Sequence, residues 1–409
     1  MIRLQSQSLR LAAAGLTLAL LGAACASPNP DASSEGKVDE TTTTTIAKGP
    51  ETTAAQLRSK LTGLLQEHVY LAAAATGAIA GGRSDEVSAA SAALDGNSEA
   101  LAANMTAIFA GTEPDATTAK QFGDLWKRHV GYVVAYAQGS AGAVNDLAQY
   151  AKDFGTFINS LLPSLPADAV TNLVSQHEQT LRAVIDAQRG KNDSEAYTDL
   201  RAAAAHMSTV GAGLTGAIAK KLPDKIGGDP ASKAAELLTG LNAGLREHVF
   251  LASAATGAAL GGRANEFAGA QAALDANSDA VTGVIAGVYG DEAGKQFAPL
   301  WKKHIDFLVD YTNAVAAKNQ PEADKAMGDL LGYTEEFGAF INAASPKLTK
   351  DAVAELIKTH VFTLKDVIDA QAAKDFTKAY TTERTAADHM AMIATGLATT
   401  VVAQFPDKF

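Results

Sequence analysis

The sequence predicts an all-α protein made of two tandem, homologous helical-bundle domains of about six helices each. Composition is the first reason, because 47% of the residues are hydrophobic and only 6% are aromatic. Alanine, the strongest helix former, supplies much of the apolar share. Apolar residues also recur every three or four positions, as in Leu57, Leu61 and Leu65, which is the spacing of a buried helix face. Finally, the helical pattern occurs twice along the chain.

The internal repeat covers nearly all of the chain beyond an N-terminal leader and tether. The stretch QEHVYLAAAATGAIAGGRSDE from Gln66 returns as REHVFLASAATGAALGGRANE from Arg246. A period of about 180 residues indicates duplication of a whole domain rather than a solenoid of short units. We therefore expect helical domains at residues 54–226 and 230–409, joined by a short polar link.

Turn-forming residues divide the first domain into six expected helices. Gly81 and Gly82 separate the first two helices, Gly111 and Pro114 separate the second from the third, and Pro166 precedes the fifth. Glycine and proline interrupt helices because of their unusual backbone preferences. The six helices are expected near residues 54–80, 84–110, 117–139, 141–161, 167–189 and 192–221.

The second domain shows the same order of helices and breaks. In the first domain, residues 192–194 (Asn-Asp-Ser) offer an N-cap for the sixth helix. A polar stretch near Asp375 occupies the corresponding place in the second. The other matching breaks are Gly261, Gly262, Gly290, Pro321 and Pro346.

Residues 1–25 are typical of an export signal. Arg3 and Arg10 supply the positive start, and residues 11–24 form an uncharged apolar segment too short for a comfortable membrane span. The small residues before Cys25 resemble a bacterial lipobox, which predicts that this cysteine is lipidated and anchors the protein to a membrane. The alternative is an ordinary signal peptide with a chance cysteine.

Residues 26–53 are rich in Pro, Ser, Thr, Asp and Glu, and such a stretch cannot bury enough apolar area to fold. They predict a flexible tether between the membrane and the helical domains. Because Cys25 is the single cysteine, intrachain disulfides and thiolate metal clusters are excluded.

The formal net charge of −11 argues against a nucleic-acid partner, because an acidic surface repels phosphate groups. The sign of the charge suits metal cations.

The histidines are the strongest candidates for a functional site. All eight occur at matched positions in the two copies, so that none is left over. Each lies in step with apolar residues on a predicted helix, which turns it towards the interior of a bundle. The pairs are His68 with His248, His129 with His304, His177 with His360, and His206 with His389.

Four imidazoles converging in a bundle predict a transition-metal or haem site. Neutral imidazole binds copper, zinc and iron, and bundles hold such ligands on facing helices. A buried imidazole without a hydrogen-bond partner costs about 1–3 kcal/mol, which a shared metal would offset. The alternative is four separate structural hydrogen bonds that each fix a helix.

Four further residues are candidates to orient the imidazoles. Asp95 and Asp275 occupy matched positions in the second helix of each domain, where a carboxylate could contact a histidine. Capping or turn formation is the alternative for both. Tyr136 and Tyr311 lie seven residues after the third-helix histidine and on its face, where they could donate to a ligand, although core packing is favoured. Glu67 adjoins His68 but points about 100° away from it, which favours a surface salt bridge or helix contact for this residue.

The phrases EHVFLA, LWKKHIDFLVDY, AYTTERTAADHM and QFPDKF resemble an uncharacterised helical domain of exported Gram-positive bacterial proteins. Some of those proteins also carry a copper-amine-oxidase-like N-terminal domain. The resemblance spans both copies and implies no functional residue, since no activity is established for that domain.

The leading interpretation is a membrane-anchored exported lipoprotein that binds a metal ion or haem through histidines inside each bundle, on the extracytoplasmic face. The alternative is a non-catalytic structural or interaction module of the cell envelope. An enzyme is less favoured, because GxSxG, P-loop and HExxH motifs are absent. No protein partner is indicated.

Overall fold

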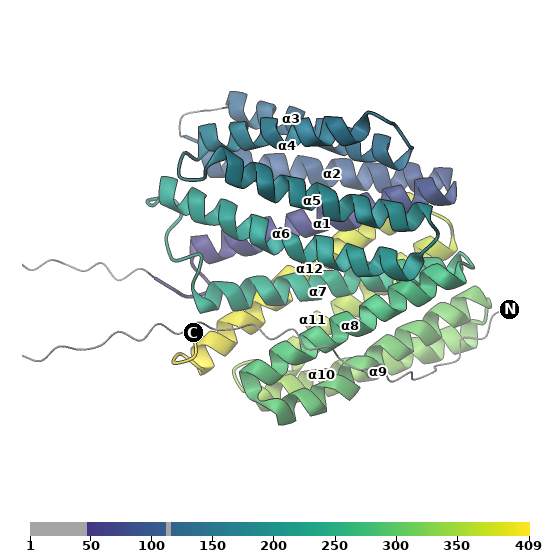
Figure 1. Cartoon of the computed structure of the whole chain (residues 1–409). Coiled ribbons are helices and arrows are strands. Elements are labelled where there is room, and N and C mark those ends of the chain that lie inside the picture. The colour runs from purple at the N-terminus through teal and green to yellow at the C-terminus, as the bar shows by residue number, and fades with distance from the viewer. Residues whose placement is uncertain (1–46, 112–115) are drawn as a thin grey trace, which may run out of the picture. The chain divides into compact units, whose positions relative to one another are not determined.

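The computed structural model describes residues 47–111 and 116–409, and within them it forms twelve helices and no strand (Figure 1). The all-α prediction is confirmed. The first copy contributes α1 (Thr53–Gly81), α2 (Ser84–Phe109), α3 (Ala116–Ala137), α4 (Ala143–Leu161), α5 (Ala167–Arg189) and α6 (Asp193–Lys221).

The second copy repeats this order of six helices. They are α7 (Lys233–Leu260), α8 (Ala264–Tyr289), α9 (Asp291–Ala316), α10 (Gln320–Ala344), α11 (Lys350–Ala372) and α12 (Phe376–Gln404).

The helix ends follow from local chemistry that the two copies share. The side chain of Thr52 accepts a hydrogen bond from the backbone N–H of Ala55 at the start of α1, and Ser232 caps α7 through Ala235 in the same way. After α1, Gly82 adopts a left-handed backbone with φ of 67°, which glycine adopts without steric cost. The side chain of Asn192 caps α6, as the sequence predicts.

Helix α1 lies at the centre of the first bundle, where it contacts α2, α3, α5 and α6 and also α7 of the second copy. Every residue from Leu64 to Ala73 is buried. A helix that is covered on all sides has no solvent-exposed polar face. The polar side chains of this segment are therefore buried together with its apolar ones. Helix α7 holds the same place in the second bundle.

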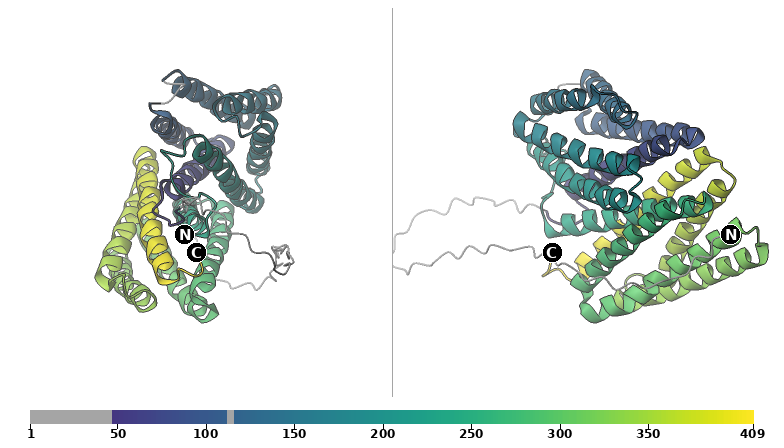
Figure 2. Two further views of the ribbon diagram at one scale, coloured as in Figure 1. Left: turned by 90° about the vertical axis from the view of Figure 1, so that its left-hand side faces the viewer. Right: turned by 45° about the vertical axis from the view of Figure 1, so that its right-hand side comes forward.

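The two copies pack together as one compact unit that spans Ile46–Phe409. Helices α1 and α7 contact each other, α6 packs on α8, and α12 packs on α2, so that several helices of each copy pack against the other copy (Figures 1 and 2). Helices α3 and α4 lie at one end of this arrangement and α9 and α10 at the other. The predicted domains at 54–226 and 230–409 are therefore two halves that share a core.

Matched residues meet across the contact between the copies, as expected for approximate two-fold symmetry. The rings of Tyr70 and Phe250, which occupy the same position in α1 and α7, stack with centroids 4.9 Å apart. Arg201 on α6 donates to Glu247 on α7 at 2.9 Å, and Arg384 on α12 donates to Glu67 on α1.

The end of the predicted tether packs against the link between the copies. The backbone N–H of Asp229 donates to the carbonyl of Ala47 at 3.0 Å, and the Ser232 hydroxyl donates to the carbonyl of Lys48 at 2.9 Å. Two short backbone segments satisfy each other's polar groups here. The rest of the tether and the leader with Cys25 lie outside the described residues.

Among the described helices, α12 has the length and apolar composition that would allow a membrane crossing, and 44% of its most apolar window is buried in the structure. Its buried residues, which include Ala386, Met390 and Val401, belong to the shared core.

Candidate metal centres

Three of the four histidines of each copy meet inside its bundle. In the first copy they are His68 on α1, His129 on α3 and His177 on α5, and their candidate ligand nitrogens lie within 4.8 Å of one another. His248 on α7, His304 on α9 and His360 on α11 form the same group in the second copy. We call these groups the first and second triads.

Helix packing brings the members of each triad together. Helices α1, α3 and α5 contact one another pairwise, as do α7, α9 and α11. His129 follows Phe122 and Trp126 on the inner face of α3, at spacings of seven and three residues that place all three on one side of a helix. The apolar stripe therefore carries the imidazole into the core.

The three rings of each triad surround a small common space. In the first triad the ring centroids lie 5.4–5.8 Å apart. In the second triad the Nε2 atoms of His304 and His248 are 3.3 Å apart. Two imidazole nitrogens that bind one tetrahedral metal at about 2.0–2.1 Å stand roughly 3.3–3.4 Å apart, so the observed separation fits such a pair.

Burial holds the triad imidazoles in the neutral form. Desolvation, and then the neighbouring His177, lower the pKa of His68 to about 3. Desolvation and the neighbouring His360 lower the pKa of His304 to about 3 as well. The pKa values of the other four triad histidines are also lowered well below 6.5, with burial the largest cause, in His129, His177, His248 and His360. Neutral imidazole is the form that binds a metal.

Most of these ring nitrogens have no hydrogen-bond partner. Both nitrogens of each first-triad histidine are buried and unpaired, and so is Nδ1 of each second-triad histidine. Each such group costs about 1–3 kcal/mol. A bound metal would satisfy one nitrogen of every first-triad ring at once, whereas in the second triad Nε2 of His304 already pairs with Nε2 of His248.

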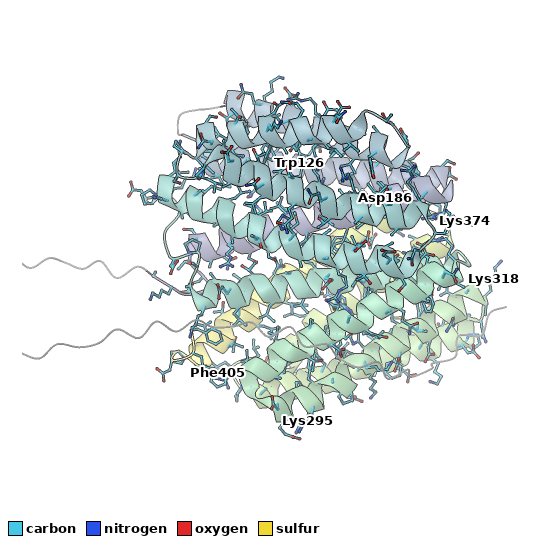
Figure 3. The ribbon with its side chains drawn as sticks, in the orientation of Figure 1. Trp126, Asp186, Lys295, Lys318, Lys374 and Phe405 are labelled. Atoms are coloured by element: carbon cyan, nitrogen blue, oxygen red, sulfur yellow. The ribbon has the colours of Figure 1, made fainter. Side chains whose placement is uncertain are left out.

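Aromatic side chains enclose the triads. The ring of Trp126 (Figure 3) on α3 meets His68 edge-on with centroids 4.8 Å apart, and Tyr150 on α4 stacks on His129 at 4.8 Å. In the second copy Trp301 lies 5.0 Å from His248, and Tyr333 stacks on His304 at 5.1 Å. These rings exclude water from the imidazoles and fix their orientation.

The fourth histidine of each copy lies outside the triad. Nε2 of His206 on α6 is 2.9 Å from the carbonyl oxygen of Leu173 on α5, and Nε2 of His389 makes the same contact with Leu356. Each ring thus links the last two helices of its bundle. The expectation of four converging imidazoles is corrected to three, because α6 and α12 use their histidine to satisfy a backbone carbonyl.

Two of the four predicted orienting residues are exposed, and the other two contact carboxylates. Asp95 and Asp275 are exposed, because their positions in α2 and α8 face outwards. The Tyr136 hydroxyl donates at 2.9 Å to Asp186 on α5, a residue labelled in Figure 3, and the Tyr311 hydroxyl donates to Asp369 at 2.7 Å. None of the hydrogen bonds found among the described residues joins these four side chains to an imidazole.

Sequence reasoning missed one residue beside the first triad, Glu178. Its carboxylate is 5% exposed and its Oε1 lies 3.9 Å from Nδ1 of His129. Burial raises the pKa of Glu178 to about 8, although nearby Arg182 opposes the shift. Attention to residues shared by the copies could not reveal it, because the second copy has Val361 at this position.

Comparisons with protein-family models, curated proteins and solved structures give no match to this chain. The resemblance inferred from the sequence therefore stays a prediction, and the chemistry of the site rests on its geometry.

The triads have the composition of a nitrogen-only metal site. Three neutral imidazoles suit zinc, copper or iron(II), whereas calcium and magnesium prefer oxygen ligands. Three protein ligands also leave a further coordination position on a tetrahedral metal. The histidine groups that could hold a metal ion are thus present in both copies.

Proposed function

We propose that the protein binds one transition-metal ion in each copy, through His68, His129 and His177 in the first and through His248, His304 and His360 in the second. The observation that carries the proposal is the convergence of three buried imidazoles in both copies, with both nitrogens of every first-triad ring lacking a hydrogen-bond partner. Such an arrangement is costly for an empty core and is relieved by a shared ion.

The geometry favours a metal ion over haem. A porphyrin plane between two rings of a triad would displace the third imidazole and the aromatic side chains packed around it. In the second copy the cavity beside His304 and His360 measures about 40 Å³. The proposed occupants are therefore zinc, copper or iron ions.

Burial favours storage of the metal over catalysis. His68 and His129 are each 1% exposed and His248 is fully buried. A catalytic metal needs a coordination position that a substrate can reach, whereas an enclosed metal exchanges slowly. We infer a non-catalytic metal-binding protein.

The leader pattern supports a place for this activity outside the cytoplasm. The proposal is that lipidated Cys25 holds the protein at the outer face of the cell membrane, where the bundles capture or retain metal. Support comes from the charged start, the apolar segment and the small residues before Cys25.

Elemental analysis of the whole protein tests the proposal, with export in a Gram-positive host and purification without nickel. We expect two metal equivalents per chain and a rise in melting temperature when metal is added to the chelator-treated protein. His129→Gln and His304→Gln should each remove one equivalent.

The matched control is His206→Gln, which changes a buried histidine outside the triads and should leave two equivalents bound. If the wild-type protein retains and takes up no zinc, copper or iron, the metal-binding proposal fails. The histidines would then be structural, as in an interaction module of the cell envelope.

A further inference from the structure

The two triads differ in one buried side chain. Within the matched segments QHEQTL and THVFTL, Glu178 follows His177 whereas Val361 follows His360. Both side chains are buried, at 5% and 2% exposure. The chain therefore places a carboxyl group beside the first triad and a hydrocarbon at the same place beside the second.

The carboxylate of Glu178 faces His129. Its Oε1 lies 3.9 Å from Nδ1 of that ring, and neither atom has a hydrogen-bond partner. A small rotation of either side chain closes this gap to a hydrogen bond of about 2.8 Å.

The repeat indicates that the opposite nitrogen of the same ring faces the centre of the triad. In the second copy, Nε2 of His304 points to Nε2 of His248 at 3.3 Å. Since His129 occupies the position of His304 in the repeat, its Nε2 is the nitrogen available to a metal. Its Nδ1–H then remains to donate a hydrogen bond to Glu178. This carboxylate–histidine–metal arrangement fixes the tautomer and orientation of a ligand and increases its basicity.

We propose that Glu178 is a positioning residue of the first centre and that it makes this centre bind metal more tightly than the second. The inference rests on the proposed metal binding. The duplicated bundles would thus serve as a high-affinity and a lower-affinity centre on one chain. The second centre has no carboxylate at this position, and it borders an apolar cavity of about 40 Å³ beside His304 and His360. No charged group therefore orients the His304 ring from that side.

The test measures each centre by itself in the whole protein. The His304→Gln background leaves the first centre intact, and the His129→Gln background leaves the second. Competition with a chromophoric chelator then gives the affinity for Zn²⁺, and the visible spectrum of bound Co²⁺ reports ligand geometry. We expect the first centre to bind Zn²⁺ at least about 10-fold more tightly than the second, and Glu178→Gln to weaken the first by about 10–100-fold.

Glu178→Val installs the residue of the second copy and should bring the two affinities together. The matched control is Glu383→Gln, which alters a buried carboxyl of the second copy whose pKa is also raised, by burial, to about 8. Glu383 lies outside both triads and its change should leave both affinities unaltered. A purely structural role for Glu178 would change the melting temperature of the metal-free protein without changing the Co²⁺ spectrum.

The outcomes separate the two proposals. Equal affinities of the two centres, with no effect of Glu178→Gln, would overturn the role of Glu178 and leave the metal centres standing. Absence of Zn²⁺ and Co²⁺ binding at both centres in the wild-type protein would remove the proposed function and this inference together.

Discussion

At the scale of single residues, the buried histidines are distinguished by what surrounds them. The ring of His206 finds a carbonyl oxygen 2.9 Å away, whereas that of His68 finds other imidazoles and Trp126. A ring that makes a hydrogen bond helps to hold its helix in place. A buried ring without a hydrogen-bond partner costs free energy that a bound ligand would offset. The sequence offers both kinds at matched positions, and it cannot separate them because both continue an apolar stripe.

The stability of the metal-free protein should depend on pH through these groups. In the unfolded chain a histidine takes up a proton near pH 6.5, but burial lowers the folded pKa of the six triad histidines, to about 3 for His68 and His304. Acidification below pH 6.5 therefore favours the unfolded state, by as much as about 1.4 kcal/mol per pH unit for each group.

Two carboxyl groups act in the opposite direction. Burial raises the pKa of Glu178 and Glu383 from 4.5 to about 8. The contribution of these two groups to the free energy of unfolding is therefore lost as the pH rises from 4.5 through 8. Below pH 6.5 the loss of stability through the six imidazoles exceeds the gain through the two carboxyls. Above pH 6.5 the two carboxyls dominate the change in the free energy of unfolding. Urea denaturation of chelator-treated protein should show greatest stability near pH 6.5; a constant free energy of unfolding between pH 5 and 6.5 would contradict this.

At the scale of elements, the close approach of two helices determines which side chains fit between them. A Cβ atom on Gly338 of α10 would lie 2.5 Å from the carbonyl oxygen of Lys350 at the start of α11. The matched Gly155 of α4 meets the carbonyl oxygen of Ala167 at 2.6 Å in the same way. Glycine is needed at both places because the backbones of consecutive helices nearly touch.

Gly338→Ala should lower the free energy of unfolding by about 1–3 kcal/mol, because the added methyl group forces α10 and α11 apart. The control is Gly328→Ala on the same helix, where nothing lies within 4 Å of the added Cβ. That change should raise stability by about 0.5–1 kcal/mol, since alanine favours the helix more than glycine does. Urea denaturation measures both, and equal effects would refute the role of close packing.

At the scale of the whole molecule, buried ion pairs join the two copies. Glu67 of α1 is 1% exposed and pairs with Arg246 of α7 and with Arg384 of α12. The sequence favours a surface salt bridge or helix contact for Glu67, whereas the structure buries this residue in an ion pair between the copies. Both arginines come from the second copy, so the pairing depends on the assembled halves.

Glu67→Gln should lower the free energy of unfolding by up to about 3–5 kcal/mol, because it leaves the buried guanidinium of Arg246 with only the exposed Asp388 as a counter-charge. The pair of half-buried Arg58 with exposed Glu236, with nitrogen and oxygen 3.9 Å apart, supplies the control. Glu236→Gln should cost no more than about 1 kcal/mol. Chemical denaturation followed by circular dichroism would measure both; similar small losses would show that Glu67 contributes little to joining the copies.

The sequence by itself determined the helices, the duplication and the candidate set of eight histidines. These depend on local chemistry: alanine content, apolar periodicity, and turn residues such as Gly82 and Asn192 that act within a few positions. The twelve helices of the structure follow that pattern.

Only the tertiary structure decided which histidines meet, which residue approaches them and how the copies join. Whether a ring contacts a carbonyl, as His206 does, or another ring, as His129 does, depends on which helices pack together and at what depth. Glu178 matters because α5 turns it towards α3, and Glu67 is buried because α7 and α12 cover α1. Such contacts join residues far apart in sequence, so periodicity along one helix cannot specify them.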